Sequence, residues 1–438
     1  MRISKPFCGG LSVLMLSVLA ACGGGSDASL QVAKGTVLKN VTVVNTRDGA
    51  LSTGMSVIVD GGKIVQVTNL PVNTSGTAQA VDGTGKFVVP GYLDMHAHVV
   101  ETADLMPTYF PLLIANGVTG FREESDSDAN KARGAKVNAD VAAGLLDAPE
   151  VIFNGGEAHL NPALSALAAS NAGMPSIDHL GAGWGLLMDC STEEATLRPA
   201  ALAGAYKPPF PADYVANPRA YDGAQNAQFY QRIFDTYSES KCVALNQAFV
   251  KNNTWQTPTL IRLRTQDWGN DALYRADANL AYVDKTRIAG WNKLGDQFAT
   301  LPASAVTTLQ QFYGLQKKSL KLMQDNGVKI MAGSDVGGVW LIAGFSLLQE
   351  FRELTAAGLT PLQVLQTTTL NPAQFLKRET SMGTVEAGKN ADLVLLDANP
   401  IASAANLEKI SGVMLRGKYF PKTALDKMKS DVAAAYAR

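Results

Sequence analysis

The segment 89–98 reads Val-Pro-Gly-Tyr-Leu-Asp-Met-His-Ala-His and combines a turn with a short apolar strand that ends in two histidines. Residues two apart in a strand point to the same face, so His96 and His98 present their imidazoles together. Paired imidazoles are typical ligands of zinc and related transition metals. A lone His-X-His is a weak signal, because two ordinary strand histidines explain it equally well.

The histidines of the chain lie close together in the sequence, and this clustering needs a reason. There are four of them, His96, His98, His159 and His179, and none occurs after position 179. Taken singly, His159 and His179 are more typical of structural histidines, and Asp335 is more typical of a turn or a helix cap. Their arrangement in the fold therefore decides what they do.

Segments on both sides of this strand predict a mixed α/β architecture. β-Rich pieces occur near both ends of the chain, at 36–45, 55–59, 63–67, 392–397 and 412–420. Residues 60–62, Asp-Gly-Gly, supply a hairpin turn. Thr360 caps a helix that starts with Pro361, and an apolar stripe over 345–354 marks another helix. The two ends of the chain are expected to complete one sheet around this middle part.

Composition and charge exclude several classes of protein. The 438 residues are 46% hydrophobic and carry 38 Lys+Arg against 39 Asp+Glu, a formal net charge of −1. Such a chain is neither disordered nor collagen-like. Without a large basic field it is not expected to bind nucleic acid. We expect an enzyme-sized globular body, and the sequence carries no signal for its oligomeric state.

The N-terminus predicts an exported lipoprotein. Arg2 and Lys5 precede the apolar run 11–21, which is long enough for a signal peptide and short for a membrane span. The run ends Leu-Ala-Ala-Cys22 before a Gly/Ser tether, and it resembles a bacterial lipoprotein signal whose cysteine is lipidated before cleavage. An ordinary signal peptide with an incidental cysteine is the alternative. Lipidation of Cys22 predicts a lipid-anchored protein of the bacterial cell envelope, on the periplasmic face of the outer membrane.

Two cysteines follow the leader and the lipidation site, Cys190 and Cys242. An oxidising compartment favours disulfides, so these residues are candidates for a bridge. Two buried free thiols are the alternative, because the sequence does not show that the sulfurs meet.

Several motifs resemble the amidohydrolase superfamily, whose members are metal-dependent hydrolases built on a (β/α)8 barrel. Segment 89–98 looks like its first-strand metal motif, and Ala-Gly-Ser-Asp at 332–335 resembles its eighth-strand turn. The other matching segments are 255–260, similar to the seventh strand of imidazolonepropionase- and prolidase-like members, 371–373, and 383–397, which resembles the return into a β-sandwich. The motifs follow the family's order over most of residues 35–420. The resemblance implies an α/β protein with a (β/α)8-type barrel and a small β-sandwich built from both chain ends.

The same resemblance implies a metal site made of His96, His98, His159, His179 and Asp335. His96 and His98 match the first strand, His159 the fifth, His179 the sixth and Asp335 the eighth. Such ligands hold a divalent ion, zinc foremost, and one ion is favoured over two. The ion would supply hydroxide, Asp335 would act as general base and then general acid, and His179 would hold the water or the substrate.

The chain departs from the family pattern between His98 and His159. A βα unit takes about 30 residues, so this interval holds about two units where four are needed. Segments 117–122 and 151–155 resemble strands two and three, and strand four is expected to be missing. In this branch strand four carries a carbamylated lysine that bridges two metals, and Lys136 is a poor substitute because its surroundings are polar and helix-like. Unpaired strand edges at such a gap are expected to displace the ligands.

Three functions follow from these observations. The first is a metal-dependent hydrolase of amide-like C–N bonds, in peptides or cyclic amides, acting on a small-molecule or peptide-like substrate. The second is a degenerate, non-catalytic envelope lipoprotein, and the third is a mononuclear deaminase. Glu157 and Asp178 match no ligand position of the family and are expected to have only structural roles.

The expected domain organisation follows the motifs. It comprises a signal peptide (1–21), a tether (22–34), a first β-sandwich part (35–86), the barrel (87–382), a second sandwich part (383–422) and a C-terminal helix (423–438).

Overall fold

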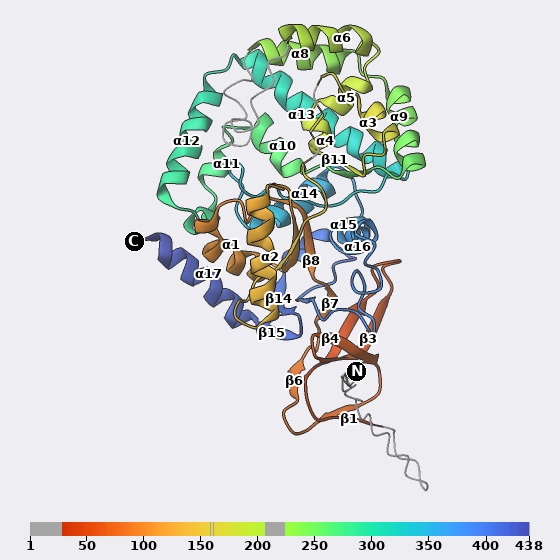
Figure 1. The fold of residues 1–438 in the computed structure, drawn as a ribbon, viewed down its shortest axis with the longest axis vertical. Coiled ribbons are helices and arrows are strands. Elements are labelled where there is room, and N and C mark those ends of the chain that lie inside the picture. Colours follow the sequence, from red (N-terminus) through yellow and green to blue (C-terminus); the bar gives the residue numbers. More distant parts are fainter. Residues whose placement is uncertain (1–28, 158, 161, 206–223, 438) are drawn as a thin grey trace, which may run out of the picture.

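The computed structural model describes residues 29–157, 159, 160, 162–205 and 224–437. Figure 1 shows a β-rich part near the N-terminus and a larger part in which helices surround a few strands. The predicted leader and the lipidation site, Cys22, lie outside the described residues.

Strands from both ends of the chain form one sheet. Its order is β15 (Lys418–Pro421), β14 (Ile410–Leu415), β13 (Leu393–Leu396), β7 (Phe87–Pro90), β2 (Thr36–Val44), β3 (Leu51–Asp60) and β4 (Lys63–Thr68), with β6 (Gln79–Asp82) also paired to β2. The antiparallel pairing of β7 with β13 joins the two ends of the chain. Gly61 and Gly62, with φ of 55° and 75°, make the two-residue turn between β3 and β4. A separate parallel pair joins β1 (Leu30–Val32) and β5 (Val72–Thr74).

A second set of strands is parallel and holds the histidine motifs. It consists of β8 (Tyr92–Ala97), β9 (Val118–Glu123), β10 (Glu150–Ile152), β11 (Ser176–Asp178) and β12 (Trp255–Thr257). Segment 330–336 lies between β8 and β12, because Met95 N donates to Ala332 O at 2.9 Å and Met331 N donates to Gln256 O at 2.9 Å. The strand order is therefore β10, β9, β8, segment 330–336, β12 and β11. Within the described ranges, no strand pairs with the outer edge of β10 or of β11.

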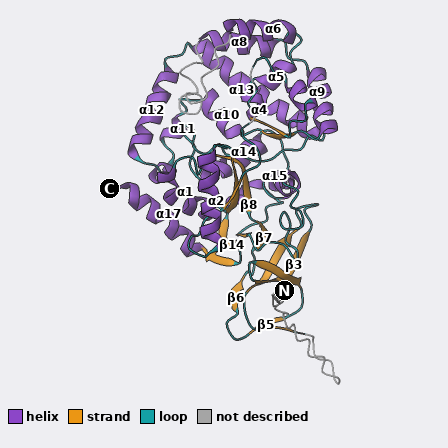
Figure 2. Cartoon of the chain, in the orientation of Figure 1, coloured by secondary structure: helices purple, strands orange, loops and turns teal. Residues whose placement is uncertain are grey.

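Helices cover these strands from outside (Figure 2). Along the first half of the chain they are η1 (Ala103–Leu105), α1 (Met106–Ala115), α2 (Asp128–Ala142), α3 (Ala166–Asn171), α4 (His179–Ala182), α5 (Gly185–Asp189), α6 (Glu194–Ala200) and η2 (Ala201–Ala205). Further along they are α8 (Ala224–Asp235), α9 (Glu239–Asn252), α10 (Leu260–Asp267), α11 (Ala272–Arg275), η3 (Ala278–Tyr282), α12 (Lys285–Ala299) and α13 (Ala303–Asp325). The last are α14 (Phe345–Ala356), α15 (Pro361–Thr367), α16 (Leu370–Phe375), η4 (Ala404–Glu408) and α17 (Lys422–Ala437). None of the described helices is both long and apolar enough to span a bilayer.

The two helices predicted near the C-terminus form as expected. Thr360 caps α15 in a capping box with Gln363, and Pro361 is its first residue. The apolar stripe of α14 is buried, and its Phe351 ring meets Tyr92 of β8 edge-on, with ring centroids 5.4 Å apart. These contacts fix β8 against the outer helical layer.

Candidate metal centre

Strand β8 delivers the first two histidines. His96 is the second-to-last residue of this strand, and His98 is the first residue after it. Both side chains are buried. Their ring centroids are 5.4 Å apart. The alternation of the strand thus places both imidazoles on one side, as segment 89–98 predicted.

Segment 330–336 carries Asp335 to the same place. The backbone amide of Asp335 donates to His96 O at 2.8 Å, and the residue has a φ of 53°. Its Oδ1 lies 3.2 Å from His98 Nε2 and 3.5 Å from His96 Nε2. Its Oδ2 lies 3.0 Å from Arg262 Nε and 3.8 Å from His179 Nε2. One carboxylate thus faces three imidazoles and a buried arginine.

His179 follows β11, and Thr259 fixes its orientation. The Thr259 hydroxyl donates to Pro258 O at 2.9 Å, so it can only accept from His179 Nδ1, which it touches. His179 therefore donates through Nδ1, and its Nε2 faces the Glu157 carboxylate 2.9 Å away. His179 and Thr259 both have positive φ, 51° and 41°. Non-glycine residues in this region, Asp335 included, mark a site where backbone strain is retained.

His159 reaches the cluster from a loop, which corrects the fifth-strand assignment. Residues 153–160, where described, form no strand and follow β10 directly. His159 Nε2 lies 2.7 Å from Glu157 Oε1. The same Glu157 oxygen lies 2.9 Å from His179 Nε2 and 3.4 Å from His96 Nε2.

The structure thus places Glu157 inside the histidine cluster, where the sequence predicted only a structural role. Its carboxylate contacts three imidazoles because the loop turns it inward next to His159. The sequence did contain a signal for this, because one residue separates Glu157 from His159, as one residue separates His96 from His98.

Behind His96 lies a second set of buried charges. Asp178 Oδ1 is 3.4 Å from His96 Nδ1, and Glu124 Oε1 is 3.9 Å from it. Arg122 pairs with both carboxylates, with its Nη2 2.8 Å from Asp178 Oδ1. Because the arginine already neutralises these oxygens, this side of His96 does not suit a second cation.

The electrostatics of the cluster favour added positive charge. Burial lowers the pKa values of His96 and His98, but neighbouring carboxylates outweigh it and hold both pKa values well above the usual value. Burial raises the pKa values of Glu157 and Asp335, but the surrounding histidines outweigh it and leave both well below the usual range. Burial and the nearby His96 lower the pKa of His179 to about 4. Two ionised carboxylates thus favour positive charge on His96 and His98, either as bound protons or as a cation in their place.

These residues fit a divalent metal. His96 Nε2, His98 Nε2 and Asp335 Oδ1 are buried and have no hydrogen-bond partner in the described part of the chain. Once the histidines lose their protons, each Nε2 lone pair faces a carboxylate oxygen, and a cation between these two acceptors would satisfy both. Three groups of ligand atoms lie close enough to hold an ion, and two of them share Glu157: His96, His98, Glu157 and Asp335, and Glu157, His159 and His179. The third group, His96, Glu124 and Asp178, contains the two carboxylates that Arg122 already pairs with.

The remaining predicted residues lie elsewhere. Lys136 is on the outer face of α2, its side chain 73% exposed and paired with Asp140 at 2.7 Å, so it cannot serve as a bridging ligand. Cys190 and Cys242 are joined by a disulfide that ties the end of α5 to α9.

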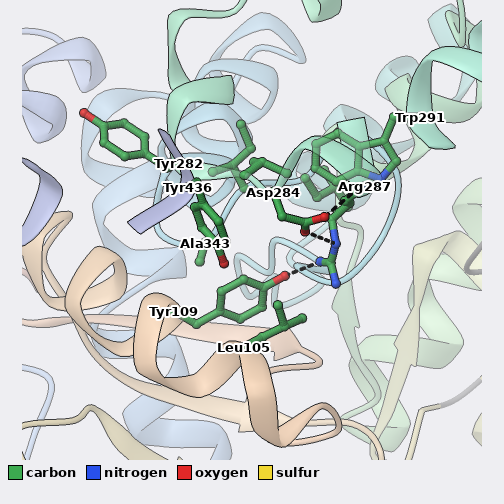
Figure 3. A pocket seen from close by; sticks show the side chains of 11 residues that line it. Leu105, Tyr109, Tyr282, Asp284, Arg287, Trp291, Ala343 and Tyr436 are labelled. Carbon is green, nitrogen blue, oxygen red and sulfur yellow. Dashed lines mark hydrogen bonds and ion pairs between the residues drawn. The ribbon is translucent and has the colours of Figure 1, made fainter. Parts of the chain in front are cut away.

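A small pocket lies near loop 336–344, apart from the histidines (Figure 3). Tyr109, Tyr282, Trp291 and Tyr436 line it, and Arg287 Nη1 donates to Tyr109 OH at 2.5 Å. Its volume of about 10 Å³ holds one water at most.

Comparison with known proteins points to one superfamily. The model of the amidohydrolase family matches residues 316–419. An adenine deaminase of Listeria welshimeri is 34% identical over 97 residues, which are 22% of this chain and 16% of that protein. A dihydroorotase of Streptococcus thermophilus is 41% identical over 66 residues, 15% of each chain. The matches thus span less than a fifth of the length of these curated relatives.

Solved structures share the fold over most of the chain. A Xaa-Pro dipeptidase with bound methionine has a TM-score of 0.55 at 16% identity, covering 89% of this chain and 100% of that one. Bottromycin amidohydrolase has a TM-score of 0.61 at 17% identity, covering 91% and 90%. Residues 316–419 thus match the amidohydrolase family, and the fold resembles those of a dipeptidase and an amidohydrolase over most of the chain. These findings support the resemblance that the motifs indicated, and the mixed α/β fold is consistent with a TIM-barrel-type domain.

The matched segment 316–419 contains Asp335 but none of the four histidines. The histidine assignments therefore rest on the geometry described above. Sequence analysis missed Arg122 and Arg262, because a single arginine in a strand or a helix gives no signal of its partners.

Proposed function

We propose that this amidohydrolase is a metal-dependent hydrolase of amide-like C–N bonds in peptides or cyclic amides. One observation carries the proposal: four imidazole Nε2 atoms, from three separate parts of the fold, converge on the carboxylates of Glu157 and Asp335. No packing role requires such a convergence of buried ionisable groups.

The geometry favours two ions over the single ion expected from the sequence. Glu157 belongs to two of the groups of ligand atoms, so one ion would be held by His96, His98, Glu157 and Asp335 and a second by Glu157, His159 and His179. Glu157 would then supply the shared ligand that the lysine of the missing strand is expected to provide. Imidazole and carboxylate ligands suit zinc, which we propose as the resident metal.

The protein groups around the ions have separate tasks. When bound, the ions would polarise the substrate carbonyl and activate the attacking water. Asp335 would accept the proton of that water at Oδ2 and return it to the leaving nitrogen. Arg262, 3.0 Å from Oδ2, keeps this carboxylate ionised and oriented. Thr259 keeps His179 in the tautomer that presents Nε2.

The open strand edges favour a shortened barrel that is complete in itself. We propose that β8–β12 and segment 330–336 form the whole barrel, without strands four and five. The sequence predicted that a gap in the barrel would move the ligands apart. The Nε2 atoms of His96, His159 and His179 nevertheless all lie within 3.4 Å of Glu157 Oε1. The degenerate, non-catalytic alternative is for this reason not favoured.

The substrate class rests on likeness alone. Structures that share the fold over most of the chain include a Xaa-Pro dipeptidase and an amidohydrolase. The adenine deaminase matches only a short part of this chain, so the deaminase alternative is not favoured. Peptide-like amides are therefore the first substrates to test.

The proposed location is the cell envelope, with lipidated Cys22 as the anchor. The disulfide between Cys190 and Cys242 supports an oxidising compartment. Labelling of cells with a radioactive fatty acid tests it: the wild-type chain should be labelled, and Cys22→Ser should not.

Elemental analysis and a substrate panel test the activity. The purified protein should contain zinc or a related ion and hydrolyse at least one member of a set of Xaa-Pro dipeptides, N-acyl amino acids and cyclic amides. Asp335→Asn should bind ions but lose turnover by about 100-fold or more. A folded wild-type protein without ions, even after refolding with zinc or manganese, would overturn the proposal.

A further inference from the structure

Different side-chain contacts are made at the two open edges of the barrel, strands β10 and β11. At β10, the amide of Asn138 on α2 binds the peptide groups of Val151: Nδ2 donates to Val151 O at 2.8 Å, and Val151 N donates to Oδ1 at 3.0 Å. A side chain thus satisfies the donor and the acceptor that a neighbouring strand would otherwise take. This contact involves only α2 and β10.

Arg122 makes a connection of another kind, across the barrel. From β9 its Nε donates to Met95 O on β8 at 2.8 Å. Its two terminal nitrogens donate to β11, to Ser176 Oγ at 3.0 Å and to Asp178 Oδ1 at 2.8 Å. The side chain is 1% exposed, and the Phe375 ring lies 5.6 Å from its guanidinium carbon. One planar guanidinium therefore links β11 to β8 and β9, with which β11 makes no strand pairing.

The link leads directly to the metal ligands. Asp178 precedes His179 in the chain, and its Oδ1 lies 3.4 Å from His96 Nδ1. Met95, the other partner of Arg122, precedes His96. The guanidinium thus binds Met95, which precedes the proposed ligand His96, and Asp178, which precedes the proposed ligand His179. A carboxylate behind a ligating imidazole sets its tautomer and its orientation.

We propose that Arg122 is a positioning residue, which replaces the missing strands by holding β11 and its His179 in register with His96 on β8. Through Asp178 it also directs the proton of His96 to Nδ1 and the lone pair of Nε2 toward the metal. This inference rests on the proposed metal centre. The competing explanation is that Arg122 forms a buried ion pair that only stabilises the fold. Asn138 provides the control for this explanation, because its side chain caps the edge of β10 and contacts no proposed metal ligand.

The test compares Arg122→Lys, Arg122→Met, Ser176→Ala and Asn138→Ala with the wild-type full-length chain. Lysine keeps the positive charge beside Asp178 and Glu124 but cannot reach Met95, Ser176 and Asp178 together. Ser176→Ala removes one of the links to β11 and leaves the buried charges paired, so it remains informative if Arg122→Met does not fold. Each protein is stripped of ions and titrated with Zn²⁺ by calorimetry.

We expect both arginine variants to bind Zn²⁺ about 10- to 100-fold more weakly than wild type. Ser176→Ala should show a smaller loss, and Asn138→Ala should keep the wild-type affinity although it lowers stability. Equal losses in Asn138→Ala and Arg122→Lys would overturn the proposal, since affinity would then follow stability. Unchanged affinity in the arginine variants would overturn it as well.

A second readout does not depend on the metal. Amide hydrogen exchange of peptides covering 176–182 is measured in the ion-free proteins. Arg122→Lys and Ser176→Ala should exchange faster there than wild type, and Asn138→Ala should not. If the wild-type chain binds no Zn²⁺, the proposed function fails, and exchange at 176–182 alone then supports or overturns the role of Arg122 in holding β11.

Discussion

Single residues decide the chemistry of this site, and Glu157 is the most informative of them. Its Oε1 lies 2.7 Å from His159 Nε2 and 2.9 Å from His179 Nε2, and Glu157 belongs to two of the three candidate ligand groups. Glu157→Gln removes the negative charge and keeps the shape. We expect the variant to lose at least half of the ions bound by wild type, as measured by elemental analysis.

The matched control for this prediction is Glu193→Gln. Glu193 pairs with Arg232 at 2.6 Å, away from the histidines, and both side chains are solvent-exposed in large part. This variant should keep the wild-type ion content. An unchanged ion content in Glu157→Gln would instead show that Glu157 is a neighbour of the metal and not a ligand.

The buried carboxyl of Glu350 is expected to make the free energy of unfolding depend on pH. It is fully buried on α14, its Oε2 accepts from Ile261 N at 2.7 Å, and burial raises its pKa to about 8. The folded state therefore keeps a proton that the unfolded chain releases near the ordinary carboxyl value. Between those two values the native state binds more protons, so stability falls as pH rises, by up to about 1.4 kcal/mol per pH unit.

Urea unfolding at pH 5.5 and at pH 7.5 measures this contribution. Glu350→Gln keeps the acceptor for Ile261 N and cannot ionise. The difference in unfolding free energy between the two pH values should be smaller in Glu350→Gln than in wild type. Equal differences in the two proteins would show that Glu350 does not titrate in this range.

Elements position these residues, and the region after β11 depends on a covalent tie. The disulfide joins Cys190, at the end of α5, to Cys242 on α9, with a sequence separation of 52. Closing a loop of this length lowers the entropy of the unfolded chain by an amount equivalent to about 4 kcal/mol. The double variant Cys190→Ala, Cys242→Ala should be less stable by a few kcal/mol in urea unfolding.

Reduction of the wild-type chain provides the comparison. Adding a reductant during unfolding should bring wild type close to the double variant and leave the double variant unchanged. If reductant has no effect on the wild-type midpoint, the disulfide contributes nothing to stability.

At the scale of the whole molecule, bound ions would link segments that lie far apart in the sequence. The ligands come from β8, the loop after β10, the end of β11 and segment 330–336. Ions that bind only the folded state stabilise it by about 2.7 kcal/mol when their free concentration is 100 times the dissociation constant. A chelator should therefore lower the melting temperature of wild type, and added Zn²⁺ should restore it.

The control for this effect is a chain with a damaged site. His96→Ala removes a ligand, so the melting temperature of this variant should respond little to the chelator or to Zn²⁺. A response equal to that of wild type would mean that the stabilising ions bind elsewhere.

The sequence by itself determined the resemblance to the amidohydrolases, the strand that carries His96, the sheet pairing between the chain ends and the turn that carries Asp335. These are local signals: a period of two in a strand, a two-glycine turn, a capped helix and a short motif are each specified by neighbouring residues. Tertiary structure alone decided that Glu157 enters the site from a loop, that Lys136 lies outside it and that Arg122 on β9 binds side chains of β11. These outcomes depend on contacts between residues tens of positions apart, and the chain fixes such contacts only when its elements pack together.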